Sequence, residues 1–141
     1  MSEPFAVRVT VRGYETDVQG HLDQAVYLDN YAEHARWSLF QEAGISRSGL
    51  VAGGVGPVTP ETTIRYRREL LAGDEVDVSR VFVRRGGKVF DIEQTITRSD
   101  GTVAAEITAV GGLLDLERRQ LVPDPRDAFR RPAREPARLG L

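Results

Sequence analysis

The spacing of apolar positions divides the first part of the chain into a strand and a helix. In residues 5–12 every second side chain is apolar, at Phe5, Val7, Val9 and Val11. This alternation predicts a half-buried strand. From about 23 to 43 the spacing changes to three and four, with apolar residues at Tyr27, Leu28, Tyr31, Ala32, Ala35, Leu39, Phe40 and Ala43. That period predicts one long helix with a wide apolar face, ended by Gly44.

Residues 44–60 break this pattern. They contain five glycines and two prolines, which predicts a loop that covers a site. The segment lacks the glycine and lysine spacing of a P-loop and of a dinucleotide-binding turn, which argues against a phosphate cradle there.

Four further strands are predicted without another helix between them. Their ranges are 62–70, 75–85, 88–98 and 102–114, and glycine-containing turns at 71–74, 85–88 and 99–101 separate them. After Leu121 the pattern dissolves into prolines among five arginines. We therefore expect a domain over residues 1–122 and a poorly ordered tail over 123–141.

The predicted order is one strand, one long helix and four antiparallel strands, which is an α+β architecture. A single helix with a wide apolar face needs a sheet to cover it, so a curved sheet wrapped around the helix is expected. Unpaired sheet edges would remain in one copy of the chain. A homodimer joined along such edges would cover them.

Composition narrows the class of protein. The 141 residues suit a single domain, and a net charge of −2 gives no reason to expect a nucleic-acid or membrane-surface partner. No apolar run approaches the ~20 residues that span a bilayer, and the expected location is the cytoplasm. The absence of cysteine excludes disulfides and thiol nucleophiles.

Candidate chemistry lies just before the helix, where Asp17 and His21 stand four residues apart with Gly20 between them. A carboxylate and an imidazole there can act in catalysis, or can instead form a turn and its hydrogen bonds. Together with Asp23 they offer only three metal ligands, so no metal is expected. No serine lies in the GxSxG pattern of a nucleophile elbow.

Three blocks of sequence carry a family resemblance: Tyr14-x-Thr-Asp17-x-x-Gly20-His21, then Ala25-x-Tyr27-Leu28, and then Glu33-x-Ala35-Arg36. They resemble the hotdog-fold acyl thioesterases, and most closely the 4-hydroxybenzoyl-CoA thioesterase-like group. The later signals Ile64-x-Tyr66, Gly73-Asp74, Asp100-Gly101 and Val103-Ala104 are similar to the same group, so that the resemblance spans residues 5–122.

The resemblance implies a hotdog fold and a homodimer, or a dimer of dimers, with active sites at the interface. It implies hydrolysis of an acyl thioester on CoA or acyl-carrier protein, without a cofactor. Asp17 would be the general base or the nucleophile. The backbone N–H of Gln24, at the helix start, would stabilise the oxyanion. His21 and Tyr27 would line the pocket.

The chain departs from the family pattern where Leu22-Asp23-Gln24 replaces a hydrophobic residue followed by two asparagines. Asp23 can still cap the helix. Glu33 matches the catalytic acid of another hotdog branch, although an ion pair with Arg36 is the favoured interpretation.

Arg65 and Arg67 share a strand face, where they could bind carrier phosphates or pair across the sheet. Two other functions stay open, namely an acyl-thioester binding module and a hotdog hydratase or dehydratase.

Overall fold

The computed structural model describes residues 5–140, which form two compact units. The first unit consists of residues 5–37, Ile64–Val81 and Glu93–Ile107. The second consists of Ser38–Thr63, Phe82–Ile92 and the residues from 108 to 140. Several strands pass from one unit into the other along the chain, and each unit is described by itself.

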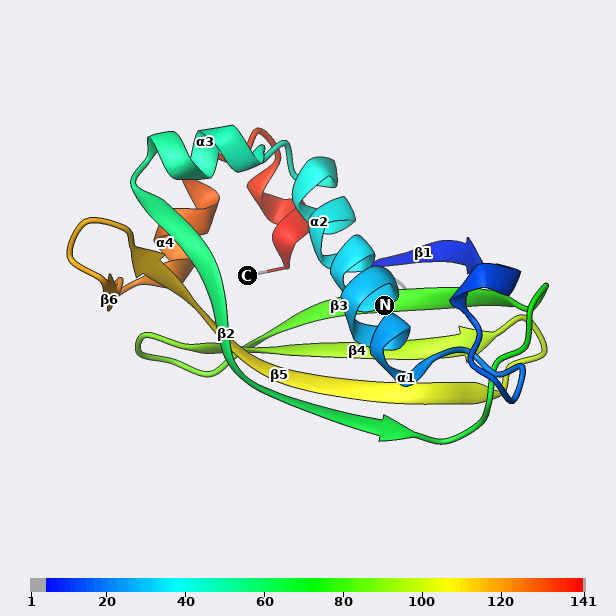
Figure 1. Ribbon diagram of the computed structural model, residues 1–141. Helices are drawn as coiled ribbons and strands as arrows, with labels where there is room; N and C mark the ends of the chain where they lie inside the picture. The colour runs from blue at the N-terminus through cyan, green and yellow to red at the C-terminus, as the bar shows by residue number, and fades with distance from the viewer. Residues whose placement is uncertain (1–4, 141) are drawn as a thin grey trace. The chain divides into compact units, whose positions relative to one another are not determined.

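The order of elements follows the predicted order of one strand, one helix and four strands (Figure 1). The strands are β1 (Phe5–Thr10), β2 (Val55–Tyr66), β3 (Glu75–Arg84), β4 (Phe90–Arg98), β5 (Val103–Asp115) and the short β6 (Gln120–Leu121). They form one sheet in the order β1-β3-β4-β5-β2, and β6 pairs with β5. In this order β1 and β2 occupy the two ends, and β1 lies antiparallel to β3 with Val7 opposite Val78.

The long helix contains a π-helical stretch. It runs through α1 (Gln24–Val26), η2 (Tyr27–Ala32) and α2 (Glu33–Glu42), and the Glu33 N–H donates to the carbonyl of Leu28, five residues back. Apolar side chains spaced by four drift around an α-helix of about 3.6 residues per turn. The wider π turn reduces this drift, which keeps both Tyr27 and Tyr31 buried.

The core of the first unit lies between this helix and the sheet. The helix contributes Tyr27, Tyr31, Ala32 and Ala35, and the strands contribute Val9, Val76, Val78, Ile96, Ala104, Ala105 and Ile107. These side chains are all at most 9% exposed. The predicted helix face and strand alternation therefore meet in one core.

A polar cluster also lies on these buried faces. Arg36 Nε donates to Gln94 Oε1 at 2.8 Å, and Gln94 Nε2 donates to the carbonyl of Ala32 at 3.0 Å. Arg80 is only 2% exposed. Burial, and next the charge of Arg36, lower the pKa of Arg80 to about 9, against a smaller opposing effect of Glu33.

The predicted loop over 44–60 is wrong in two places. Residues Arg47–Ala52 form the helix α3, whose N-cap Ser46 accepts a hydrogen bond from the Gly49 N–H at 3.0 Å. Strand β2 begins at Val55, before Pro57 and Pro60, and ends at Tyr66 rather than continuing to 70. Proline is tolerated in a strand at the end of a sheet, because one side of that strand needs no donors.

The segment after residue 122 is not a poorly ordered tail. It contains α4 (Pro125–Arg130) and η3 (Pro136–Leu139), and both Phe129 and Leu139 are buried. Phe129 joins an aromatic cluster of the second unit that also contains Phe40, Phe82 and Phe90. Its ring stacks on that of Phe40 at a centroid distance of 5.3 Å.

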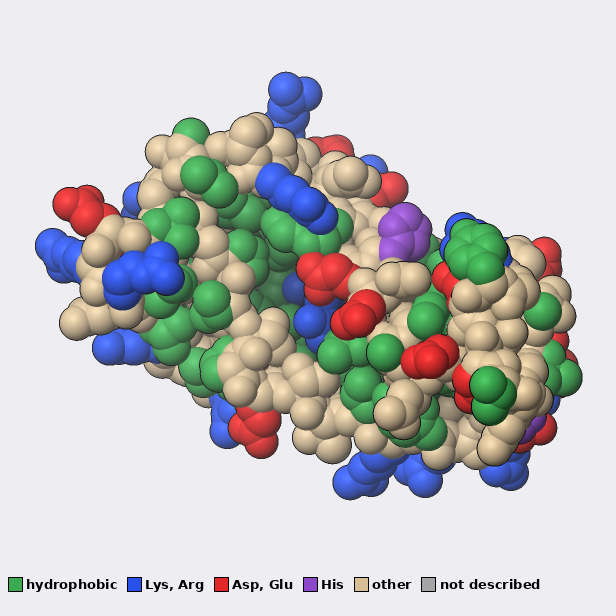
Figure 2. Space-filling model, in the orientation of Figure 1, with side chains coloured by type: hydrophobic (Ala, Val, Ile, Leu, Met, Phe, Trp, Pro, Cys, Tyr) green, Lys and Arg blue, Asp and Glu red, His purple; other side chains and the backbone are tan. Residues whose placement is uncertain are grey.

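Charged side chains of both signs lie on the face shown in Figure 2, in keeping with the small net charge. Within residues 5–140, no helix is both long enough and apolar enough to cross a bilayer.

Candidate active site

A tight turn holds Asp17. The Gly20 N–H donates to the carbonyl of Asp17 at 3.0 Å, and the Asp17 N–H donates to the carbonyl of His21 at 2.8 Å. Gly20 has a φ of +80°, which other residues adopt only with strain. Asp17 Oδ1 accepts from the N–H of Gln19 at 2.9 Å and of His21 at 3.3 Å. The turn thus orients an exposed carboxylate by one of its two oxygens.

Backbone hydrogen bonds tie this turn to its surroundings. The Leu22 N–H donates to the carbonyl of Leu70 at 2.7 Å, and His21 forms a bridge with Leu71. The Asp23 N–H donates to the carbonyl of Glu15 at 3.0 Å. These hydrogen bonds therefore fix both ends of the loop that carries Asp17.

The side chain of Glu15, two residues before Asp17, is 4% exposed. Its Oε1 accepts from the Tyr31 hydroxyl at 2.7 Å and from the Arg12 N–H at 2.9 Å. Burial by itself raises the pKa of Glu15, but the hydrogen bonds from Tyr31, Arg12 and Asn30 together with the Arg12 charge outweigh it. The pKa of Glu15 therefore lies below its ordinary value.

The helix starts at Gln24. Asp23 is its N-cap, as predicted, and accepts a hydrogen bond from the Ala25 N–H at 3.0 Å. The Tyr66 hydroxyl donates to the Gln24 carbonyl at 2.9 Å, and the Tyr66 ring lies edge-on to Tyr27 at a centroid distance of 5.1 Å. The N–H of Gln24 belongs to the first turn, where an α-helix supplies no acceptor.

These groups surround one pocket of about 560 Å³. It is lined by Asp17, His21, Leu22, Asp23, Gln24, Tyr27, Tyr66, Arg67, Arg68 and Glu69. Five of the six predicted site residues are thus brought together, although they are spread over more than forty positions of the chain. Arg65, the sixth, lies outside this pocket and is exposed on β2.

Arg67 is on the rim of the site and has a partner in the sheet. Its Nε donates to Glu106 Oε1 at 3.1 Å, and both side chains are about half exposed. This is the cross-strand pair that the sequence left open as an alternative to phosphate binding.

The chain matches the thioesterase-like superfamily over residues 11–133, which is most of its length. It belongs to this superfamily. The predicted family resemblance is therefore confirmed.

Two curated proteins illustrate the relationship. The long-chain acyl-CoA thioesterase FadM of Escherichia coli (strain K12) is 29% identical over 111 residues, which cover 78% of this chain and 83% of FadM. The chloroplastic acyl-acyl carrier protein thioesterase ATL3 of Arabidopsis thaliana is 33% identical over 75 residues, which cover 53% of this chain and 39% of ATL3.

A solved structure agrees with them. The crystal structure of YbaW from Escherichia coli, described as a probable thioesterase, has a TM-score of 0.79 and 26% identity, covering 89% of this chain and 96% of YbaW. The predicted α+β hotdog fold is confirmed, and so is the prediction of an enzyme that hydrolyses thioesters.

Glu33, the alternative acid of this thioesterase-like chain, is engaged on the helix. Its Oε1 accepts from Trp37 Nε1 at 2.6 Å, and its Oε2 lies 3.8 Å from Arg36 Nη1. The pair with Arg36 agrees with the structural role favoured from the sequence. His34 is exposed on the helix surface.

No cluster of three or more histidine and carboxylate side chains among residues 5–140 is arranged to hold a metal ion.

The contacts of two residues, Glu15 beside the site and Tyr66 in its lining, were not predicted from the sequence. Glu15 carries a signal, because it lies three residues after Arg12 and accepts from the Arg12 N–H as a capping glutamate does. Tyr66 carries none for its bond to Gln24, since 42 residues separate the two. Contacts of that range are set by the packing of β2 beside the helix start.

Proposed function

We propose that this chain hydrolyses the thioester bond of an acyl group carried on CoA or on acyl-carrier protein, with Asp17 as the reacting carboxylate. The observation that carries the assignment is the convergence of Asp17 and the N-terminus of the long helix on one pocket of a thioesterase-like protein. The names of FadM and ATL3 support the two kinds of carrier.

The role of Asp17 follows from how it is held. Backbone N–H groups of Gln19 and His21 orient Oδ1, and the proposal assigns the reaction to the other oxygen. That oxygen either removes a proton from water or attacks the thioester carbonyl directly. Either route needs an ionised carboxylate, and the exposed position of Asp17 keeps it hydrated until substrate enters.

The oxyanion is assigned to the N–H of Gln24. The Asp23 carboxylate accepts from Ala25 rather than from Gln24, so capping leaves the Gln24 N–H for the substrate carbonyl. The positive end of the helix dipole adds to its effect on a developing negative charge. His21 and Tyr27 line the same pocket and would contact the acyl thioester there.

Carrier binding and assembly complete the proposal. Arg65 and Arg67 would meet the phosphates that CoA and phosphopantetheine share, with Arg67 exchanging Glu106 for a phosphate oxygen. β1 and β2 lie at the ends of the strand order, so pairing of such a strand with a second copy would give a homodimer, or a dimer of dimers. We place this enzyme in the cytoplasm, which suits a chain without cysteine.

The test is thiol release from a panel of aromatic and aliphatic acyl-CoAs and from acyl-carrier protein. Asp17→Asn is expected to lower kcat by ~10²-fold or more, because it removes the carboxylate at nearly constant size. Asp29→Asn, which changes an exposed carboxylate on the long helix outside the pocket, is the matched control and should keep the wild-type rate.

Equal rates in wild type and Asp17→Asn would remove Asp17 from the mechanism and direct attention to Glu33. If the wild type cleaved no thioester on either carrier but still bound one, the proposal would be wrong and an acyl-thioester binding module would replace it. Loss of enoyl absorbance without thiol release would instead indicate a hydratase.

A further inference from the structure

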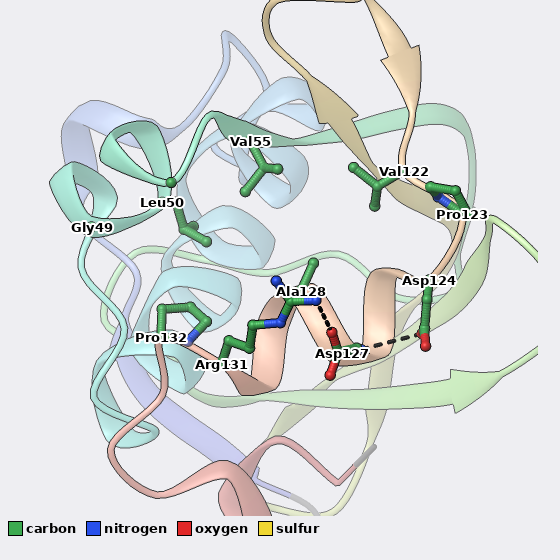
Figure 3. Close-up of a pocket in the computed structure, with 11 residues that line it drawn as sticks. Gly49, Leu50, Val55, Val122, Pro123, Asp124, Asp127, Ala128, Arg131 and Pro132 are labelled. Carbon is green, nitrogen blue, oxygen red and sulfur yellow. Dashed lines mark hydrogen bonds and ion pairs between the residues drawn. The ribbon is translucent and has the colours of Figure 1, made fainter.

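A second pocket lies wholly within the second unit and shares no lining residue with the pocket of Asp17 (Figure 3). Its walls come from α3, the first residue of β2, the segment after β6, and α4. Its volume is about 600 Å³, which is within the range of small-molecule sites. It is lined by Gly49, Leu50, Gly53, Val55, Val122, Pro123, Asp124, Asp127, Ala128, Arg131 and Pro132.

The side chains that face the pocket are mainly aliphatic. Leu50, Val55, Val122 and Ala128 point toward one another from four different segments, as Figure 3 shows. The wall formed by α4 is firmly held, since the next residue along it, Phe129, is fully buried in the aromatic cluster. The pocket is thus an open, mainly aliphatic hollow supported by packed elements.

The charged residues at its rim are engaged with one another. Asp124 caps α4 and accepts from the Asp127 N–H at 3.2 Å. The Asp127 carboxylate forms an ion pair with Arg131 one turn later. An anionic ligand would face two carboxylates and a single arginine that already has a partner, so charge disfavours it.

Water is a poor occupant of the inner part of such a space. A buried water molecule usually makes about three hydrogen bonds, and the aliphatic walls offer no partners for them. An alkyl chain, in contrast, gains by leaving water for apolar surroundings, in proportion to the area it buries. The aliphatic side chains of the lining therefore favour a hydrocarbon ligand over water.

We propose that this pocket binds an uncharged alkyl chain. The assignment does not rest on the proposed function, because it uses only residues of the second unit. The chain belongs either to the acyl group of a thioester or to a free amphiphile such as a fatty alcohol, and the experiment below separates these two sources.

The first measurement is a titration with hexanol, octanol and decanol, observed in the methyl NMR spectrum. The methyl resonances of Leu50, Val55 and Val122 are expected to shift and saturate. Affinity should rise roughly two- to fourfold for each added methylene, and decanoate should bind more weakly than decanol. Absence of saturation, equal affinity at all lengths, or tighter binding of decanoate would overturn the proposal.

Substitution provides the matched control. Ala128→Leu fills the pocket from α4 and is expected to weaken decanol binding by at least ~10-fold. Ala52→Leu makes the same change on an exposed position of α3 outside the pocket and should bind as wild type. If Ala128→Leu fails to fold, Val55→Phe makes the same test. Unchanged affinity in the folded pocket variant would contradict the assignment.

The source of the chain follows from S-decyl-CoA, a thioether that cannot be hydrolysed. Shifts of the same methyl groups with this analogue would assign the pocket to the substrate's acyl group. Shifts with decanol alone would assign it to a separate ligand. Asp17→Asn should bind decanol as wild type does, so that a failure of thioester hydrolysis and a failure of alkyl binding are observed independently.

Discussion

The hydroxyl of Tyr31 donates a 2.7 Å hydrogen bond to Glu15 Oε1, and both side chains are almost completely buried. This bond joins the middle of the long helix to the loop that leads to Asp17. Burial, followed by the bond to Glu15, raises the pKa of Tyr31 above its ordinary value, so the hydroxyl stays a donor. The site loop is therefore attached to the long helix through a buried carboxylate that takes no part in the proposed reaction.

Glu15→Gln is expected to lower the free energy of unfolding at neutral pH by about 1–3 kcal/mol, because it weakens hydrogen bonds to a buried ionised acceptor. The folded-state pKa of Glu15 lies below its ordinary value of 4.5. The unfolded state therefore binds the proton more readily, and the contribution is present above pH 4.5 and lost as pH falls through the folded-state pKa. Urea unfolding of wild type and variant across this range should show their difference shrinking in acid.

Tyr31→Phe is the companion variant for this pair. It should destabilise the protein by a similar amount, and the double variant should lose less than the sum of the two single losses, because the two residues share one bond. Strict additivity would show that the bond contributes nothing to stability.

Tyr66→Phe is expected to lower kcat by about 2- to 10-fold with a smaller change in KM. The variant loses the hydrogen bond to the Gln24 carbonyl and with it the exact placement of the helix start. Stability should fall by about 0.5–1.5 kcal/mol at most. Tyr14→Phe, at a tyrosine that is 83% exposed, is the control in the same thiol-release assay. Equal kinetics in the two variants would separate Tyr66 from the site.

Arg80→Met replaces a buried cation beside Arg36 by an uncharged chain of similar length, and it is expected to remove the part of the pH dependence of stability that comes from the titration of Arg80. The folded-state pKa of Arg80 is lowered to about 9 from 12.5. Between these pH values the unfolded wild type binds more protons than the folded one. The free energy of unfolding of the wild type should therefore rise relative to that of the variant as pH increases above 9. Urea unfolding from about pH 8 to about pH 11 measures this difference.

A difference between wild type and Arg80→Met that is constant over this range would contradict the lowered pKa. Arg126→Met makes the same substitution at an exposed arginine of α4 and is the control, whose stability should show no such change with pH.

Phe129→Ala is expected to lower the free energy of unfolding by about 3–5 kcal/mol, because it removes a fully buried ring from the aromatic cluster. Arg126→Ala on the exposed side of α4 should change it by no more than about 0.5 kcal/mol. Denaturant unfolding compares the two. A negligible effect of Phe129→Ala would mean that α4 does not belong to the folded core.

The sequence by itself determined the elements that repeat a simple period. The alternation of Val7 and Val9 and the three-and-four spacing from Tyr27 to Ala43 identify a strand and a helix, because each period places the apolar side chains on one face. The turn at Gly20 and the cap at Asp23 were equally legible, since both depend on neighbours only a few residues away. The family blocks around Asp17 then identified the superfamily.

The tertiary structure decided what depends on partners distant in sequence. The prolines and glycines of residues 44–60 predicted a loop, so that α3 and the start of β2 were missed. For β2 the reason is that a strand at the end of a sheet tolerates prolines that a central strand would not. The arginine-rich segment after 122 looked too polar to pack, yet its few apolar side chains, such as Phe129, enter a cluster that exists only in the folded chain. The contacts of Glu15 and Tyr66 depend on how helix and strand lie together. The local sequence pattern shows which side chains are buried. Which residues they then contact is determined by the packing of the helices and strands.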